Sequence, residues 1–138
     1  MSARDFFHDN VRHALEKAGW TITDDPLHLR YGVADVYIDL AAEKLFAAER
    51  EGEKIAVEVK SFLGSSAISE FHTALGQFLN YRIVLEIEEP GRVLYLAVPL
   101  NTYNSFLKFE PVNTAIERYQ VNLLVYEPSQ EVVSQWIK

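Results

Sequence analysis

Residues 53–60 of the chain read Glu53-Lys54-Ile55-Ala56-Val57-Glu58-Val59-Lys60. Successive side chains of a β-strand point to opposite faces of the sheet. One face of this run therefore takes three branched apolar side chains, and the other takes Ala56, Glu58 and Lys60. The sequence predicts a largely apolar strand that holds a carboxylate and an ammonium group about 7 Å apart on one face.

The segments around this strand alternate between helical and extended patterns. Apolar residues at helical spacing predict helices over 5–18, 69–88 and 111–119, and Asn101 or Thr102 is expected to cap a further short helix. Extended patterns predict strands over 20–23, 27–31, 45–50, 92–98 and 121–126, whereas the tail at 132–137 is ambiguous. This order predicts a mixed sheet with helices packed on it, in one α/β domain that covers residues 1–138.

A second carboxylate is expected near Glu58, because a Mg²⁺ site normally takes one in addition to the first. If Glu51-Gly52 forms a two-residue hairpin turn, Glu43 lies opposite Lys60 and on the same sheet face as Glu58. Asp39 has the same parity, and a bulge or bend before Glu43 would bring it in instead. Asp39 is the better residue type and Glu43 the better geometric position, so both remain candidates.

Four side chains form the candidate constellation. The carboxylate of Glu58 can bind a hard cation while Lys60 orients or polarises an attacking water. Gln77 and Tyr81 stand four residues apart and share one side of the following helix, where they can hold the lysine, a metal-bound water or a phosphate. Taken alone, the strand pair is better explained as a solvated sheet face with a weak ion pair. Taken alone, the helix pair is better explained as the margin of a core. Their combination favours a functional site.

Composition limits the class of protein. Hydrophobic residues make up 49% and charged residues 24% of the chain, as in ordinary globular proteins, and there is no cysteine for disulfides or thiolate metal sites. No apolar run is long enough to span a bilayer and the N-terminus lacks a signal pattern, so we expect a cytoplasmic protein with no membrane partner. The net charge of −7, with only 13 Lys and Arg, argues against simple DNA binding through phosphates. Either the acids hold divalent cations, or a partner or second copy helps to hold DNA, or DNA is not a ligand.

Two resemblances follow from these residues. Asp39 or Glu43, then Glu58-x-Lys60 and Gln77-x-x-x-Tyr81, resemble the motif of the PD-(D/E)xK nuclease superfamily and its RecB-like branch, and this comparison favours Asp39. A longer resemblance, to the XisH family of element excision-controlling factors of heterocyst-forming cyanobacteria, covers nearly the whole chain. It rests on the segments HALEKAGWTITDDPL, IDLAAEKLFAAERE, KIAVEVKSFLGSSAISEF, ALGQFLNYR, GRVLYLAVP and SQWIK.

The resemblance implies a restriction-endonuclease-like fold, a role in DNA excision or rearrangement, and a partner protein of the XisI type. One position departs from the superfamily pattern. Many relatives place an acid on the first helix where this chain has His8, and we expect His8 to be an exposed helix histidine, with a ligand or proton-shuttle role as the alternative.

Three hypotheses for function follow. The first is a DNA endonuclease that uses Mg²⁺, or Mn²⁺, held by Asp39 (alternate Glu43) and Glu58. In it Lys60 assists the water and Gln77 steadies the site, with Tyr81 and His8 as alternates. The second is a non-catalytic accessory of DNA rearrangement that binds a recombinase or partner protein. The third is a structural or dimerisation module, since the sequence leaves the oligomeric state open, a homo-oligomer included.

Overall fold

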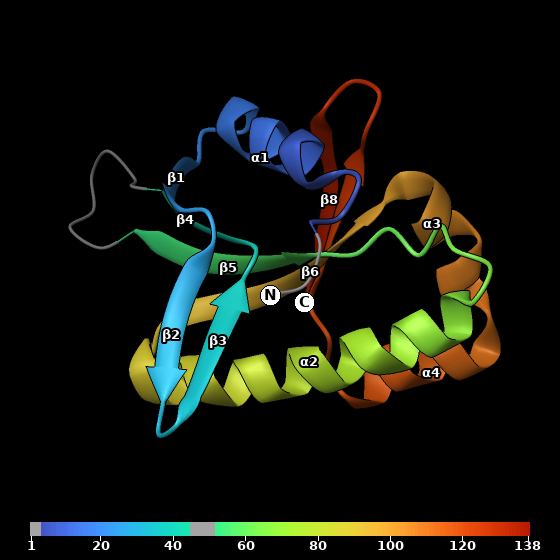
Figure 1. Ribbon diagram of the computed structural model, residues 1–138. Coiled ribbons are helices and arrows are strands. Elements are labelled where there is room, and N and C mark those ends of the chain that lie inside the picture. The colour runs from blue at the N-terminus through green and yellow to red at the C-terminus, as the bar shows by residue number, and fades with distance from the viewer. Residues whose placement is uncertain (1–3, 45–51) are drawn as a thin grey trace.

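The computed structural model describes residues 4–44 and 52–138 (Figure 1). Its helices are α1 (His8–Lys17), α2 (Ala67–Glu88), α3 (Leu100–Asn104), the 3₁₀ helix η1 (Phe106–Lys108) and α4 (Glu110–Arg118). Its strands are β1 (Thr21–Asp24), β2 (Leu27–Tyr31), β3 (Ala34–Ile38), β4 (Leu40–Lys44), β5 (Glu53–Val59), β6 (Arg92–Pro99), β7 (Leu123–Glu127) and β8 (Val132–Ile137). The expected combination of a mixed sheet and flanking helices is confirmed. The predicted strand over 45–50 lies outside the described residues.

Six strands form one sheet in the order β1-β4-β5-β6-β7-β8, and β2 and β3 form a separate antiparallel hairpin. β5, β6 and β7 run parallel, while β1, β4 and β8 extend the sheet by antiparallel pairing. Parallel neighbours need a crossover connection. α2 supplies it between β5 and β6, and α3, η1 and α4 supply it between β6 and β7. The carboxyl ends of β5 and β6 therefore meet at one edge of the sheet.

The register between β4 and β5 differs from the expected one. Glu43 pairs with Lys54 rather than with Lys60, and Leu40 pairs with Val57. The expectation assumed a two-residue turn, but the last pair joins Lys44 to Glu53, so the connection is longer and the strands meet further back along the chain. Hydrophobic burial rather than turn chemistry sets the register here. Leu40 and Val57 belong to the same buried cluster.

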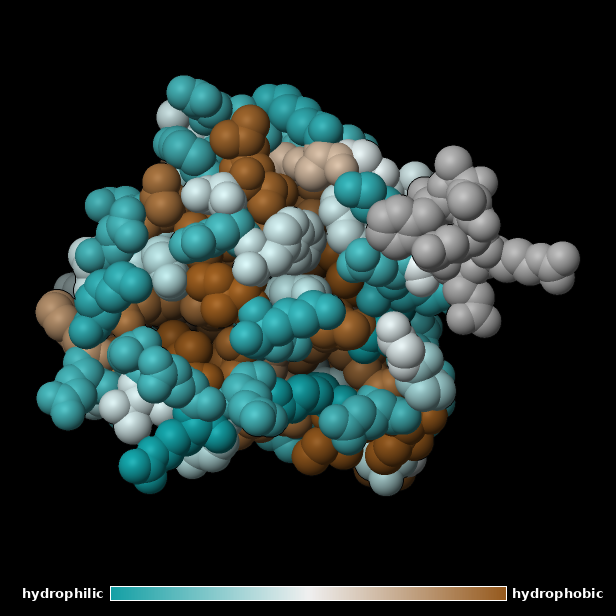
Figure 2. Space-filling model, turned by 180° about the vertical axis from the view of Figure 1, so that it is seen from behind, coloured by the Kyte–Doolittle hydropathy of each residue, from teal (hydrophilic) through white to brown (hydrophobic). Residues whose placement is uncertain are grey.

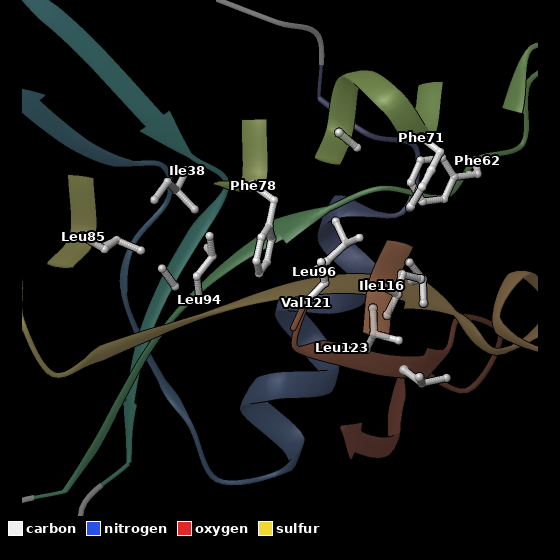
Figure 3. Close-up of a cluster of buried hydrophobic side chains, with 14 of the residues drawn as sticks. Ile38, Phe62, Phe71, Phe78, Leu85, Leu94, Leu96, Ile116, Val121 and Leu123 are labelled. Atoms are coloured by element: carbon white, nitrogen blue, oxygen red, sulfur yellow. The ribbon is translucent and has the colours of Figure 1, made fainter. Parts of the chain in front are cut away.

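Each face of the sheet carries its own core. α1 covers one face, and α2 and α4 cover the other (Figure 1). On the α2 face, Phe71, Phe78 and Leu85 of the helix pack with Leu94 and Leu96 of β6 (Figure 3). The β2–β3 hairpin contributes to this second core and contacts α2. The alternation expected for β5 is confirmed. Its branched side chains lie in the core under α1, and Ala56 lies in the core under α2: Ile55, Val57 and Val59 on the first side, Ala56 on the second.

The exterior mixes polar and apolar side chains. Seen from behind, hydrophilic side chains alternate with hydrophobic ones across the centre and lower edge of the molecule (Figure 2). The most exposed large apolar side chains include Phe6, Val33 and Phe109, which belong to three separate parts of the chain. Within residues 4–44 and 52–138 no helix is long and apolar enough to cross a membrane.

Candidate functional site

The candidate site lies at the carboxyl end of β5, on the sheet face that α2 covers. Glu58 has the same parity along the strand as Ala56 and therefore faces α2. Its side chain is buried, although most neighbours on this face are apolar. Burial of a carboxylate among apolar residues costs free energy unless a charge or hydrogen bond compensates it.

Asp39 lies beside Glu58. The backbone N–H of Asp39 donates a hydrogen bond to Glu58 Oε1 at 3.2 Å, and the backbone N–H of Val59 donates to Asp39 Oδ2 at 2.7 Å. The register explains this proximity. Because Leu40 is opposite Val57, the residue before Leu40 arrives next to the residue after Val57. Asp39 is also the link between β3 and β4, so the hairpin leads directly into the site.

Glu43 lies elsewhere. Its carboxylate is 3.9 Å from Lys54 Nζ and 3.7 Å from a guanidinium nitrogen of Arg92, towards the amino ends of β5 and β6. The expected position opposite Lys60 was wrong, because the strand register is displaced. Of the two alternatives for a second acid, the structure brings Asp39 next to Glu58 and leaves Glu43 near the far end of the strand.

Lys60 completes a compact charged group. Its ammonium nitrogen is 3.9 Å from Glu58 Oε2, and 27% of its side chain is exposed. The backbone N–H of Lys60 donates to the carbonyl of Ala97 in β6 at 3.0 Å, which anchors the lysine directly after the end of β5. The ammonium group is thus near a buried carboxylate and still open to solvent.

The electrostatics of the site favour a bound cation. Burial, and then the negative charge of Asp39, raise the pKa of Glu58 to about 8, and the positive charge of Lys60 opposes this rise. At neutral pH, the two adjacent carboxyl groups therefore hold a proton. A divalent cation between them would replace that proton and offset the repulsion between the carboxylates.

The donor set also fits Mg²⁺ or Mn²⁺. Mg²⁺ is commonly bound by one or two carboxylates, with waters and substrate phosphates completing its octahedron. Asp39 and Glu58 supply two carboxylates at one place. No group of three His, Asp or Glu suited to a metal occurs within the part of the chain that the structure describes, so any such ion would rely on oxygens from outside the protein.

Gln77 and Tyr81 lie on α2, on the side that faces the sheet. Burial raises the pKa of Tyr81, and the charges of Glu58 and Asp39 raise it further, so its hydroxyl is within electrostatic range of both carboxylates. Gln77 stands one turn earlier, and its Oε1 is buried without a hydrogen-bond partner among the described residues. An unpaired buried acceptor is costly, which makes Gln77 a ready acceptor for a donor from a ligand or a bound water.

His8 does not belong to this group. It is buried, with 3% of the residue exposed, so the expectation of an exposed helix histidine was wrong. Its Nε2 is 2.7 Å from Asp25 Oδ1, and Asp25 also accepts hydrogen bonds from Arg4 and Arg12. Helical spacing did not reveal this partner, because Asp25 follows β1 and returns to the helix through the fold. His8 and Asp25 tie α1 to the connection between β1 and β2.

A cavity that the sequence did not indicate opens beside Lys60. Its volume is about 290 Å³, and its lining residues are Asp5, Lys60, Ser61, Phe62, Ser69, Glu70 and Thr73. Asp5 was overlooked because an acid before a helix is an ordinary capping pattern. Its carboxylate instead contacts Ser61, a residue 56 positions away. No local pattern in the sequence signals a contact of that kind.

Comparison with known proteins places the chain in a family. The family model described as XisH protein matches residues 1–134. The crystal structure of an XisH family protein from Nostoc punctiforme PCC 73102 is 56% identical, with a TM-score of 0.87, over 97% of this chain and 100% of that chain. The crystal structure of an fdxN element excision controlling factor protein from Anabaena variabilis is 55% identical, with a TM-score of 0.87, over 98% of this chain and 100% of that chain.

No curated protein sequence matches the chain. The family model nevertheless covers nearly all of it, and both solved structures are more than half identical to it over their full length. The chain belongs to the XisH family.

Proposed function

We propose that this chain is a metal-dependent DNA endonuclease with a PD-(D/E)xK, restriction-endonuclease-like core, and that it acts in the excision of a DNA element. The observation that carries the proposal is the adjacency of Asp39 and Glu58, with the ammonium group of Lys60 3.9 Å from Glu58 Oε2. The description of the Anabaena variabilis relative as an excision controlling factor supports the biological role.

In this proposal each residue has a separate task. Asp39 and Glu58 would hold Mg²⁺, or Mn²⁺ in its place. A bound divalent ion neutralises charge on the phosphate and lowers the pKa of a coordinated water. Lys60 would orient the attacking water and offset negative charge on the phosphorane-like transition state. Gln77 would accept a hydrogen bond through its unpaired Oε1, and the Tyr81 hydroxyl would face the same space.

The state of Glu58 explains why the protein needs the ion for this chemistry. Without a cation, burial and the neighbouring Asp39 favour the protonated form of Glu58, which is a poor metal ligand and a poor partner for Lys60. Ionisation of Glu58 and cation binding therefore support each other. The ion would order Asp39, Glu58 and Lys60 as one charged unit.

A cleavage assay with matched lysine variants tests the proposal. Supercoiled and linear DNA are incubated with Mg²⁺ or Mn²⁺ and the wild-type protein, Lys60→Ala or Lys54→Ala. Lys54 lies on the same strand, its side chain is exposed, and it pairs with Glu43 at the far end. We expect Lys60→Ala to abolish cleavage with little change in melting temperature, and Lys54→Ala to retain it. Cleavage by Lys60→Ala at the wild-type rate would rule the proposal out.

A second candidate function is a non-catalytic accessory role, in which the same fold binds a recombinase or an XisI-like partner. The net charge of −7 favours it, because a nuclease gains much of its DNA affinity from basic residues. Under this alternative, DNA remains intact with every divalent metal, and the partner co-purifies equally with wild-type protein and with Glu58→Ala. Under the nuclease proposal, DNA contacts shared with a partner or a second copy would compensate for the acidic charge.

A further inference from the structure

The two residues that follow β5 are held by three separate parts of the fold. The N–H of Lys60 donates to the carbonyl of Ala97 in β6 at 3.0 Å. The carbonyl of Ser61 accepts a hydrogen bond from the buried hydroxyl of Thr102 in α3 at 2.8 Å. The N–H and the hydroxyl of Ser61 both donate to Asp5 Oδ2 at 3.0 Å. Every backbone hydrogen-bonding group from the Lys60 N–H to the Ser61 carbonyl, apart from the carbonyl of Lys60, has a printed partner from a distant segment.

Asp5 joins this segment to the first helix. Its other oxygen, Oδ1, accepts a hydrogen bond from the N–H of Phe7 at 2.9 Å, immediately before α1 begins. One carboxylate therefore connects the start of α1 to the residue that directly follows Lys60. Charge-assisted hydrogen bonds of this kind are stronger than those between neutral groups, so the connection is firm.

The position of this connection is informative because the strand has ended there. Beyond Val59 the ladder no longer holds the chain, and Phe62 adopts a positive φ of 54° that turns the backbone sharply. Lys60 stands between the last residue of the strand and this turn. Without the tethers on Ser61, the backbone that carries the Lys60 side chain would have freedom to shift.

Asp5 and Lys60 also line the same cavity of about 290 Å³. The cavity gives solvent access to the lysine, whose side chain is partly exposed. Asp5 itself directs both oxygens at Ser61 and Phe7, so it is committed to the protein and not to the cavity.

We propose that Asp5 is a positioning residue for Lys60, acting through Ser61 to hold the ammonium group at its place beside Glu58. This inference rests on the proposed nuclease function and adds to it a residue outside the strand and helix motifs. A displacement of about 1 Å in a catalytic group can cost on the order of 100-fold in rate, which is sufficient reason for a dedicated tether.

The test compares Asp5→Ala, Asp5→Asn and Ser61→Ala with the control Asp9→Asn. Asp9 lies in the first turn of α1, its side chain is exposed, and its nearest ionic neighbour, Arg4, is 3.9 Å away. For each variant the kcat and KM of DNA cleavage are measured, together with Mn²⁺ affinity by calorimetry and the melting temperature. Ser61→Ala removes only the hydroxyl donor and keeps the backbone N–H, so it is a mild variant should Asp5→Ala fold poorly.

For Asp5→Ala we expect a loss of about 10- to 100-fold in kcat, with KM and Mn²⁺ affinity unchanged. Asp5→Asn keeps one acceptor oxygen and should fall between Asp5→Ala and the wild type, and Ser61→Ala should show the smallest loss. A kcat for Asp5→Ala equal to that of Asp9→Asn would overturn the positioning role. So would an equal loss of kcat and Mn²⁺ affinity, since Asp5 would then support the whole site. If wild-type protein does not cut DNA, the nuclease proposal itself fails and this inference falls with it.

Discussion

Replacement of Glu58 by glutamine should stabilise the protein, and the gain should grow with pH. Glutamine has nearly the same shape as glutamate but carries no charge to bury. In the folded protein, burial and the charge of Asp39 raise the pKa of Glu58 from 4.5 to about 8. Each pKa unit corresponds to about 1.36 kcal/mol between the two protonation states. Complete ionisation of Glu58 in the folded state therefore costs about 5 kcal/mol.

The sign follows from linkage. The folded state binds the proton of Glu58 more tightly than the unfolded state does, so its stabilising effect is fully present below pH 4.5. That effect is lost as the pH rises from 4.5 to about 8. Wild-type protein should lose about 5 kcal/mol relative to Glu58→Gln across this window. In a chain of this size such a difference corresponds to a shift on the order of 10 °C in melting temperature.

Urea unfolding and calorimetry at pH 5, 7 and 9, with a chelator present, measure the difference directly. Glu53→Gln is the matched control, since Glu53 lies at the exposed start of the same strand. Other titrating groups cancel when the variant is compared with wild type at each pH. A constant difference between Glu58→Gln and wild type from pH 5 to pH 9 would refute the reasoning, because it would mean that Glu58 ionises as it does in water.

Two further predictions follow from the same contacts. Mg²⁺ affinity of the wild-type protein should increase as the pH rises towards about 8, with release of a proton, because the cation needs the ionised form of Glu58; calorimetry in buffers of different ionisation enthalpy measures this proton, and pH-independent affinity would contradict it. Asp25→Asn should cost about 1–3 kcal/mol in urea unfolding at pH 7, because His8 and Arg12 lose a charged acceptor; stability equal to that of Asp24→Asn would contradict it.

Sequence reasoning succeeded where the physics is local. The alternation along β5 follows from strand geometry, and it places Glu58 on the face of α2 without knowledge of any neighbour. The helix expected over 69–88 and the doubly buried strand over 92–98 correspond to α2 and β6 for the same reason. Their apolar periodicities are strong, and glycine and proline mark the boundary between them.

It failed where a contact depends on the assembled sheet. The choice between Asp39 and Glu43 required the register of β4 on β5, and a plausible two-residue turn gave the wrong one. The burial of His8 required its meeting with Asp25 across the fold. The contact between Asp5 and Ser61 joins segments that no periodicity connects. Site geometry in this protein therefore depends on long-range packing around a strand that the sequence identifies well.

The central claim is that Asp39 and Glu58 together hold a divalent cation. Calorimetric titration with Mn²⁺ tests it most directly, with wild-type protein, Asp39→Asn and Glu43→Gln as a matched set. We expect binding by the wild-type protein, loss of that binding in Asp39→Asn, and retention in Glu43→Gln, whose carboxylate lies near Lys54 and Arg92 instead. Absence of Mn²⁺ binding by the wild-type protein, or loss in Glu43→Gln with retention in Asp39→Asn, would contradict the account.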